Sequence, residues 1–507
     1  MSGEPGRIIL KGGHVIDPGQ GIDRIADISI TDGKIEAIGE ISPGDGEIID
    51  LGGLYVCPGW VDLHVHAYGT LGFGDPDSIG IYQGVTTMVD AGGSGIGTLD
   101  EFDALLGGGQ TVTGLYAGPH LHPFGIIGLS YIEDEVRSFN AVPIAGWQDW
   151  MADHPGFVRY LKAGAYGLMG TIPLYMGKGV AELIGVPFYL HIGEYRVQEN
   201  HPRTDIVGFD IVQSGDIVTH IYNGNFGNVL DDDGKVMPHV RAAERRGVIF
   251  DIGFGGYNFS WDVAEKAYAQ DLVPHVISSD LQQFNVCSPV FSLANVMSVC
   301  MRIGMSLTDV IEKVTLAPAR ALSLADVAGA LRPGMPADVT VFKIEEGAFQ
   351  LVDCDAQYRD AEQRIAPVMA FKAGQKFDCD LLMAQDERKW FMHIAEDHVP
   401  AAAENLTPTQ HRFLTALTEA LAEVDWAAGS AERLNTDKAY ELQNVFHEVR
   451  DAENLPLRDA LMGLFDCFID DPFTMQVGLF LVRLERNFAL ERLSDVTGAK
   501  IHAIARA

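Results

Sequence analysis

The sequence predicts an α/β protein built on a (β/α)8 barrel of the TIM type, with a discontinuous small β-sandwich domain and a C-terminal helical domain. Strand-like segments open the chain and recur near residues 329–382, and eight apolar runs alternate with helical stretches between them. Strand signals then disappear after about residue 381. A chain of 507 residues is long enough for a barrel with smaller units beside it.

The small β-sandwich domain is predicted from two separate parts, residues 1–56 and 329–382. In the first part, Asp32-Gly33 stands between two alternating runs, which is a strong signal for a β-hairpin. The second part contains the strand-like segments LRPGMPADVTVFKI and PVMAFKAGQKF. We therefore expect the chain to return after the barrel and complete the sheet begun at its N-terminus.

The barrel is expected over residues 57–328. Eight short apolar runs lie there, separated by helical stretches, and most end in polar or chemically useful residues. Side chains at the ends of barrel strands meet at one face, where such folds carry their chemistry. The runs are WVDLHVH, VTTMVDAG, VTGLYAGPHLH, FVRYLKAG, VPFYLHIGE, DIVTHIYNG, GVIFDIGFG and PHVISSD.

The segment 383–507 is predicted to be a separate helical domain. Thr407 to Gln410 reads as a capping box with Pro408 at the first helical position. The segments AYELQNVFHEV and GLFLVRLERNFALERL are comparably amphipathic. The helix after the capping box would bury one apolar face made of Phe413, Leu414, Leu417, Leu421 and Val424.

Charge and cysteine usage limit the partners and the location. A net charge of −34 disfavours nucleic acid and anionic membranes as general partners, because both are negatively charged. The six cysteines show no CxxC spacing, which fits a reducing compartment. The first residues lack a signal peptide pattern, and no run of about 18 apolar residues occurs. We expect a cytoplasmic protein that forms a homo-oligomer.

His64 and His66 are the first candidate metal ligands. They lie two positions apart on one predicted strand, so both imidazoles point to the same face. Imidazole suits zinc, iron, nickel or copper. A single pair of this kind is weak evidence, because many are ordinary strand residues.

Three later runs strengthen this interpretation. His191, His220 and Asp280 each follow a different predicted barrel strand. Any one of them could be a buried, hydrogen-bonded residue. Together with His64 and His66 they indicate a metal site at the barrel mouth.

Lys162 closes the run that should form the fourth strand. A buried ammonium is costly, so this lysine either pairs with a carboxylate, loses its proton or reacts. Near two metals, an uncharged lysine could be carboxylated by carbon dioxide and bridge both ions. The alternative is a lysine that extends from the strand end to solvent.

The chain resembles the amidohydrolase superfamily over residues 5–380, and within it the dihydroorotase-like amidohydrolase/deacetylase family. The segments that carry the resemblance are PGWVDLHVHAYG, the run that ends at Lys162, HIGE, THIYNG, DIGFGGYNFSWDVAEKA, ISSD, APAR and LRPGMPADVTVF. The resemblance implies that His64, His66 and Asp280 hold one metal and that His191 and His220 hold another. It further implies that carboxylated Lys162 bridges two divalent ions, with zinc the expected metal.

The resemblance also implies a reaction. A hydroxide between the two metals would attack a carbonyl, and Asp280 would act as general acid and base. The expected function is a metal-dependent amidohydrolase or deacetylase that cleaves an amide or ester bond of a small carboxylate-bearing substrate. Two alternatives stay open: a cyclic-amide hydrolase similar to dihydroorotase or hydantoinase, and a catalytically silent regulatory barrel.

Substrate contacts are expected from the loops after the strands. Arg196 is the candidate for a substrate carboxylate, since guanidinium matches that anion with two hydrogen bonds, although a surface ion pair is an equal alternative. Relatives commonly show histidine where this chain has Phe254, so the pocket is expected to differ from theirs. Other candidates for the pocket lining are Asn223, Tyr222, Tyr257, Asn258 and Gln282.

Two further features give weaker signals. His120 and His122 form another HxH pair, for which we predict a role in the pocket or in packing, because the third strand supplies no metal ligand in the family. Residues 406–493 faintly resemble the helical C-terminal region of class I lysyl-tRNA synthetases. That likeness suggests a tRNA-linked fusion protein, but the acidic composition of the tail favours a dimerisation or supporting bundle.

Overall fold

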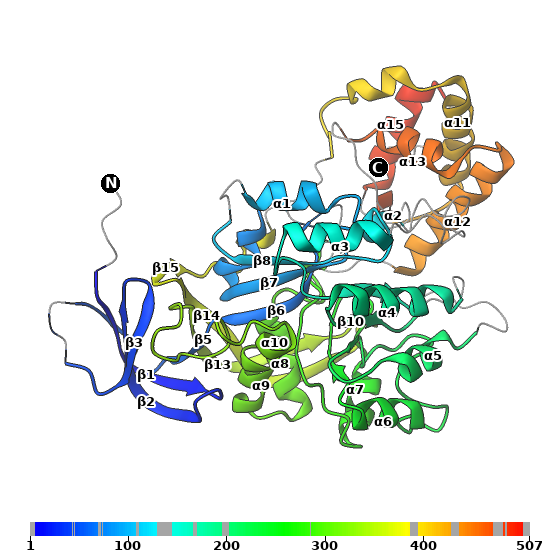
Figure 1. The fold of residues 1–507 in the computed structure, drawn as a ribbon. Helices are drawn as coiled ribbons and strands as arrows, with labels where there is room; N and C mark the ends of the chain where they lie inside the picture. The colour runs from blue at the N-terminus through cyan, green and yellow to red at the C-terminus, as the bar shows by residue number, and fades with distance from the viewer. Residues whose placement is uncertain are drawn as a thin grey trace.

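The computed structural model shows a central α/β body, a small sheet beside it and a group of C-terminal helices (Figure 1). The small sheet lies at the left of that view and the C-terminal helices at the upper right. The structure describes residues 6–42, 44, 46–68, 72, 75–107, 111–128, 144–165, 170–194, 202–283, 285–385, 394–426, 436–469, 480–481 and 484–499.

The small sheet contains eight strands from both ends of the predicted barrel. The return of the chain is therefore confirmed: β13 pairs with β5 in antiparallel orientation, and β5 pairs with β1 in parallel. The sandwich and the domain boundaries stay predictions. The strands are β1 (Ile8–Asp17), β2 (Ile22–Thr31), β3 (Lys34–Gly39), β4 (Glu47–Asp50), β5 (Tyr55–Pro58), β13 (Val339–Val352), β14 (Tyr358–Lys372) and β15 (Gln375–Asp378).

The hairpin expected at Asp32-Gly33 joins β2 to β3. Both residues have positive φ, 50° for Asp32 and 72° for Gly33. Two-residue hairpin turns of type I′ need this left-handed geometry at both positions, and Asp-Gly adopts it at low cost. Thr31 and Lys34 face each other directly across the turn. The predicted hairpin is confirmed.

The central body contains two parallel sheets. Seven of the eight predicted apolar runs contain one of their strands. In Figure 1 the helices lie over these sheets. One sheet has β6 (Trp60–Val65), β7 (Val85–Ala91) and β8 (Gly114–Gly118), and the other has β9 (Leu161–Gly164), β10 (Phe188–His191), β11 (Ile217–Thr219) and β12 (Ile249–Phe250).

Isolated backbone bridges connect the two parallel sheets on both sides. Ala117 pairs with Val158 and His120 with Lys162, next to β8 and β9. On the other side the segment 276–281, from the eighth predicted run, bridges to Asp251 and to Val65. This segment is not a regular strand, but it occupies the place where the sequence predicts one.

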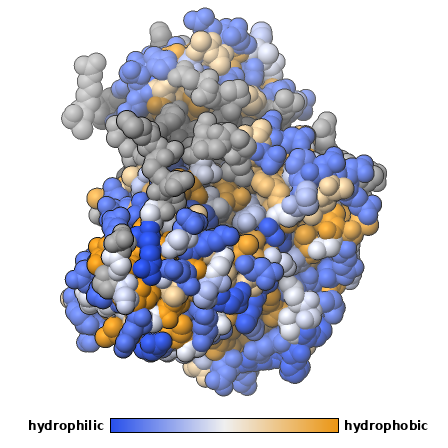
Figure 2. All heavy atoms as spheres, turned by 60° about the vertical axis from the view of Figure 1, so that its left-hand side comes forward, coloured by the Kyte–Doolittle hydropathy of each residue, from blue (hydrophilic) through white to orange (hydrophobic). Residues whose placement is uncertain are grey.

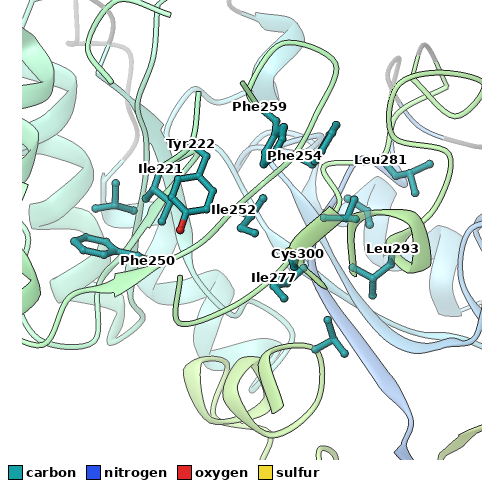
Figure 3. Close-up of a cluster of buried hydrophobic side chains, with 14 of the residues drawn as sticks. Ile221, Tyr222, Phe250, Ile252, Phe254, Phe259, Ile277, Leu281, Leu293 and Cys300 are labelled. Carbon is teal, nitrogen blue, oxygen red and sulfur yellow. The ribbon is translucent and has the colours of Figure 1, made fainter. Parts of the chain in front are cut away.

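Helices follow most strands of the central body. The core between strands and helices is one large apolar cluster, part of which Figure 3 shows around Phe250, Ile277 and Leu293. The helices are α1 (Leu99–Gly107), α2 (Gly125–Gly128), α3 (Ile144–Asp153), α4 (Ile172–Ile184), α5 (Thr204–Ile211), α6 (Pro238–Arg245), α7 (Trp261–Tyr268), α8 (Leu293–Ile303), α9 (Leu307–Lys313) and α10 (Leu316–Ala321).

The C-terminal helices have a hydrophobic core of their own. Thr407 and Gln410 form the predicted capping box, with Pro408 in the first turn, and the predicted apolar face of the first helix is buried. These two predictions are confirmed. The described helices are α11 (Pro408–Ala422), α12 (Thr436–Ala452), α13 (Leu457–Phe465) and α15 (Arg486–Thr497).

On the face that Figure 2 shows, hydrophobic patches lie between hydrophilic residues. Among the described residues, no helix combines the length and apolar character needed to cross a membrane. All six cysteines are free thiols, as the absence of CxxC spacing suggested. The cytoplasmic location stays a prediction.

Candidate metal centre

His64 and His66 come from the end of β6 and converge with Asp280. The Nε2 atom of His64 lies 3.3 Å from Oδ1 of Asp280, and Nε2 of His66 lies 3.1 Å from the same oxygen. All three side chains are buried, and their ligand atoms lie within 4.8 Å of one another. In the described part of the chain, no other group of three histidine, cysteine or acidic side chains converges in this way.

The backbone bends sharply at two of the predicted ligands. His220 has φ of 70° and Asp280 has φ of 49°, a left-handed conformation that is uncommon for residues other than glycine. Strain of this kind gathers at functional sites, where the surrounding structure maintains it. Gly255 makes room for the Asp280 carboxylate, because a Cβ atom there would lie 2.3 Å from Oδ2.

His191 and His220 form a second group beside the first. Their ring centroids are 4.3 Å apart, and the ring of His220 lies 5.2 Å from that of His64. Nδ1 of His220 contacts the carbonyl of Gly253 at 2.6 Å, and Nε2 of His191 contacts that of Gly193 at 3.3 Å. Carbonyls accept hydrogen bonds, so these nitrogens carry the protons. The lone pairs are then on Nε2 of His220 and Nδ1 of His191.

Lys162 lies on β9 next to both groups. Its Nζ is 3.0 Å from Nε2 of His64 and donates to the carbonyl of Ala91 at 2.9 Å. The side chain is buried, so extension to solvent does not explain it. Burial lowers the pKa of Lys162 to about 8, which makes the uncharged amine accessible near neutral pH.

The charge states suit metal binding. Burial lowers the pKa of His64 to about 4 and that of His191 to about 3, so both are neutral at pH 7. Burial alone would raise the pKa of Asp280, but His64 and His66 hold it well below its usual range. Neutral imidazoles and a carboxylate are the ligand forms that zinc and similar divalent ions require. The residues therefore fit a divalent metal.

Two of the predicted pocket residues contact the carboxylate of Asp280. Gln282 donates from Nε2 to Oδ1 at 3.0 Å, and Asn258 donates from Nδ2 to Oδ2 at 3.2 Å. Asn223 instead donates to the carbonyl of His220 at 2.7 Å and accepts from the amide of Asn225 at 2.9 Å. Its side chain thus holds the turn after β11.

Tyr222 does not fit the predicted pocket position. Its ring is fully buried in the apolar core, where Figure 3 shows it near Ile221, and its hydroxyl donates to the carbonyl of Leu272 at 2.6 Å. Tyr257 is partly buried, and its carbonyl accepts a hydrogen bond from Asn225. Arg196 lies outside the residues that the structure describes.

Phe254 also lies in the core. It is fully buried and stacks on Phe259, with ring centroids 4.4 Å apart (Figure 3). The aromatic side chain is thus accommodated by apolar packing.

His120 and His122 lie close to the site without joining the ligand cluster. His120 pairs through its backbone with Lys162, and both histidines are buried. Backbone amides donate to Nδ1 of each ring, from His122 at 2.9 Å and from Phe124 at 3.2 Å. The location matches the predicted role in the pocket or in packing.

Sequence reasoning missed a polar network behind His64. Asp251, at the end of β12, accepts hydrogen bonds from Tyr189, Thr219 and Ser278. The hydroxyl of Tyr189 also lies 2.8 Å from Nδ1 of His64. One signal was available: Tyr189 precedes His191 by two positions on a strand, so both point to one face.

Residues 261–375 match the model of the amidohydrolase family. Among curated proteins, the chain is 31% identical over 382 residues to a deacetylase of Enterococcus faecalis, which covers 73% of this chain and 99% of that protein. It is also 33% identical over 338 residues to deacetylase Atu3266 of Agrobacterium fabrum, covering 65% of this chain and 79% of that protein.

Solved structures give the same result. A structure described as an adenine deaminase matches with a TM-score of 0.65 and 31% identity, over 73% of this chain and 99% of the other. A structure described as a dihydroorotase matches with a TM-score of 0.65 and 30% identity, over 74% and 98%. These neighbours imply a TIM-barrel-type α/β fold for the matched part. The chain belongs to the amidohydrolase family and is a metal-dependent hydrolase that acts on carbon–nitrogen bonds.

Proposed function

We propose that this chain is a deacetylase-type amidohydrolase that cleaves an amide or ester bond of a small, carboxylate-bearing substrate. The observation that carries the proposal is the convergence of His64, His66 and Asp280 beside His191 and His220. The identity to two proteins named as deacetylases supports the reaction class.

Two divalent ions are proposed as cofactors, with zinc the expected metal. His64, His66 and Asp280 would hold one ion, and His191 and His220 the other. Bound ions of this kind lower the pKa of a water molecule towards about 7 and polarise a carbonyl group. The bridges on both sides of the two parallel sheets support a closed eight-stranded barrel around this site, with 276–281 as the eighth strand.

Lys162 is proposed to be carboxylated. Its uncharged amine would add to the carbon of carbon dioxide, so that a nitrogen–carbon bond forms and one amine proton leaves. The resulting carbamate carries one negative charge and two oxygen atoms, which suit a bridging position between two ions. The burial of Nζ and its contact with His64 support this assignment.

Asp280 is proposed as the general acid and base. Its ionised carboxylate would take a proton from the attacking water and deliver it to the leaving amine or alcohol as the tetrahedral adduct collapses. Asn258 and Gln282 donate hydrogen bonds to its two oxygens, which keeps the carboxylate in one orientation.

The remaining substrate-binding roles are proposed from the place of the residues in the sequence, after predicted strands. Arg196 is proposed to bind the substrate carboxylate, and Tyr257 and Gln282 to line the pocket. The hydrogen bonds of Asn223 favour a supporting role at the turn after β11 over direct contact.

Cyclic-amide hydrolysis is the second candidate function. A segment of 61 residues is 48% identical to a dihydroorotase of Geotalea daltonii, although it covers only 12% of this chain and 14% of that protein. The two reactions can be separated by comparing the turnover of N-acyl amino acids and acylated hydroxy acids with that of cyclic imides. Faster turnover of the imides would favour the second.

Metal analysis tests the proposed site directly. Protein purified with bicarbonate should contain about two equivalents of divalent metal, the number that a two-metal centre holds. Lys162→Ala should lose most of it, because the bridging group is gone, while Lys178→Ala, on α4 away from the site, should keep it. Wild-type protein without metal would contradict the proposal.

A further inference from the structure

Four buried hydroxyl and carboxylate groups lie directly behind His64, on the side away from Asp280. They belong to Tyr189, Thr219, Asp251 and Ser278, from four different segments of the barrel. All four are fully buried, so bulk water does not satisfy their hydrogen bonds. Every proton in this cluster therefore needs a defined partner.

Counting protons assigns their positions. Tyr189 donates to Oδ2 of Asp251 at 2.6 Å, and Thr219 donates to the same oxygen at 2.7 Å. Ser278 donates to the carboxylate at 2.8 Å. The carboxylate accepts only, so each hydroxyl gives its single proton to Asp251.

The consequence falls on His64. The oxygens of Tyr189 and Thr219 lie 2.8 Å and 3.4 Å from Nδ1 of His64. Both hydroxyl protons point to Asp251, so only lone pairs face the ring. Nδ1 must then carry the proton and donate it to Tyr189, which leaves the lone pair on Nε2, the nitrogen that faces Asp280.

We propose that Tyr189 and Asp251 are positioning residues that lock His64 in the tautomer able to bind a metal through Nε2. The arrangement corresponds to a carboxylate that orients a metal-binding histidine, with a tyrosine hydroxyl inserted between the two groups. This inference rests on the proposed function, because the tautomer matters only when His64 is a ligand.

Co²⁺ is the probe for the test. Its dissociation constant would be measured on the full-length protein by competition with a chelator, and its visible absorption spectrum recorded. Tyr189→Phe should weaken Co²⁺ binding by about 10- to 100-fold, the usual effect of losing an outer partner of a ligand histidine. Asp251→Asn should do the same, because an amide can donate to Tyr189 and turn the phenol proton towards Nδ1.

Tyr160→Phe is the matched control. Tyr160 is equally buried and stacks on Tyr189 with centroids 4.3 Å apart, but its hydroxyl donates to the carbonyl of Leu63. This variant should bind Co²⁺ like the wild type. Equal weakening by Tyr160→Phe and Tyr189→Phe would show a packing effect and overturn the proposal.

The double variant tests whether both groups act through one path. Asp251→Asn should weaken Co²⁺ binding much less in the Tyr189→Phe background than in the wild type. In that background the hydrogen-bond path from Asp251 through Tyr189 to His64 is already broken. If Asp251→Asn weakens Co²⁺ binding equally in both backgrounds, Asp251 does not act through Tyr189. If Asp251→Asn does not fold, Thr219→Val replaces it, because Thr219 also contacts both Asp251 and His64.

The two proposals fail differently. Wild-type protein that binds no Co²⁺ would overturn the proposed function and this inference together. Tight wild-type binding that Tyr189→Phe leaves unchanged would overturn the inference alone.

Discussion

The central α/β body and the C-terminal helices differ in how they pair their buried polar side chains. In the central body many polar groups contact one another: Asp251 receives three hydroxyl donors, and His64 contacts Lys162 and Tyr189. In the C-terminal helices several contact backbone instead, although Arg450 pairs with the carboxylate of Asp451. Arg492 donates to the carbonyls of Cys467 and Ala395.

This difference separates chemistry from folding. A buried polar side chain is costly unless it is paired, and pairing to backbone is enough to stabilise a helix bundle. A buried cluster of polar side chains with neutral histidines stabilises a fold no more than apolar packing would. A function therefore explains such a cluster better than stability does. Substitutions of these groups should therefore change activity in the central body, and substitutions in the helices should change stability.

Asp280→Asn should give the largest effect. We expect kcat to fall by about 10²- to 10⁴-fold, the usual contribution of a general acid and base, while most of the metal stays bound. Steady-state kinetics and metal content on the same sample would check this. Asp233→Asn, at an exposed acidic loop residue, is the control and should leave kcat unchanged. A near-normal kcat with full metal would contradict the role of Asp280.

Leu417→Ala in α11 should show the reverse pattern. Leu417 is fully buried in the helical core, and truncation of such a leucine costs about 2–5 kcal/mol. Hydrogen exchange in peptides from α11 should rise strongly, while kcat stays the same. Glu419→Ala, on the exposed side of the same helix, should change neither. A fall in kcat with Leu417→Ala would show that the helices support the active site.

Several features of both regions could be predicted from the sequence, because the signals for them are local. The two-residue spacing of His64 and His66, the Asp-Gly hairpin and the capping box each depend on a few neighbouring residues. The convergence of the ligands at the strand ends was predicted, but the hydrogen bonds behind them were not, because Tyr189, Asp251 and Ser278 come together only when separate strands pair.

Tyr222 shows how a local rule failed. Tyr222 was expected to line the pocket because it lies in the loop after a predicted strand. The strand β11 ends at Thr219, however, and the left-handed backbone of His220 turns the chain. Tyr222 therefore points into the core, and its hydroxyl reaches Leu272. A position directly after a strand end therefore does not by itself place a side chain in the pocket, because the backbone turn at the ligand redirects the residues that follow.

Thr407→Ala should give the smallest loss of stability, and it tests how the C-terminal helices are connected to one another. The hydroxyl of Thr407 accepts from the amide of Gln410 at 3.2 Å, and Gln410 accepts from the amide of Thr407 at 2.9 Å. Loss of such a cap costs about 0.5–2 kcal/mol.

Gln410 also donates to the carbonyl of Asp459, which joins the cap to the start of α13. Loosening of Gln410 should therefore raise hydrogen exchange in the first turns of both α11 and α13. Thr409→Ala, in the same first turn but outside the cap, is the control. If exchange rises in α11 alone, the cap stabilises only its own helix, and the bundle depends on its apolar contacts rather than on this polar link.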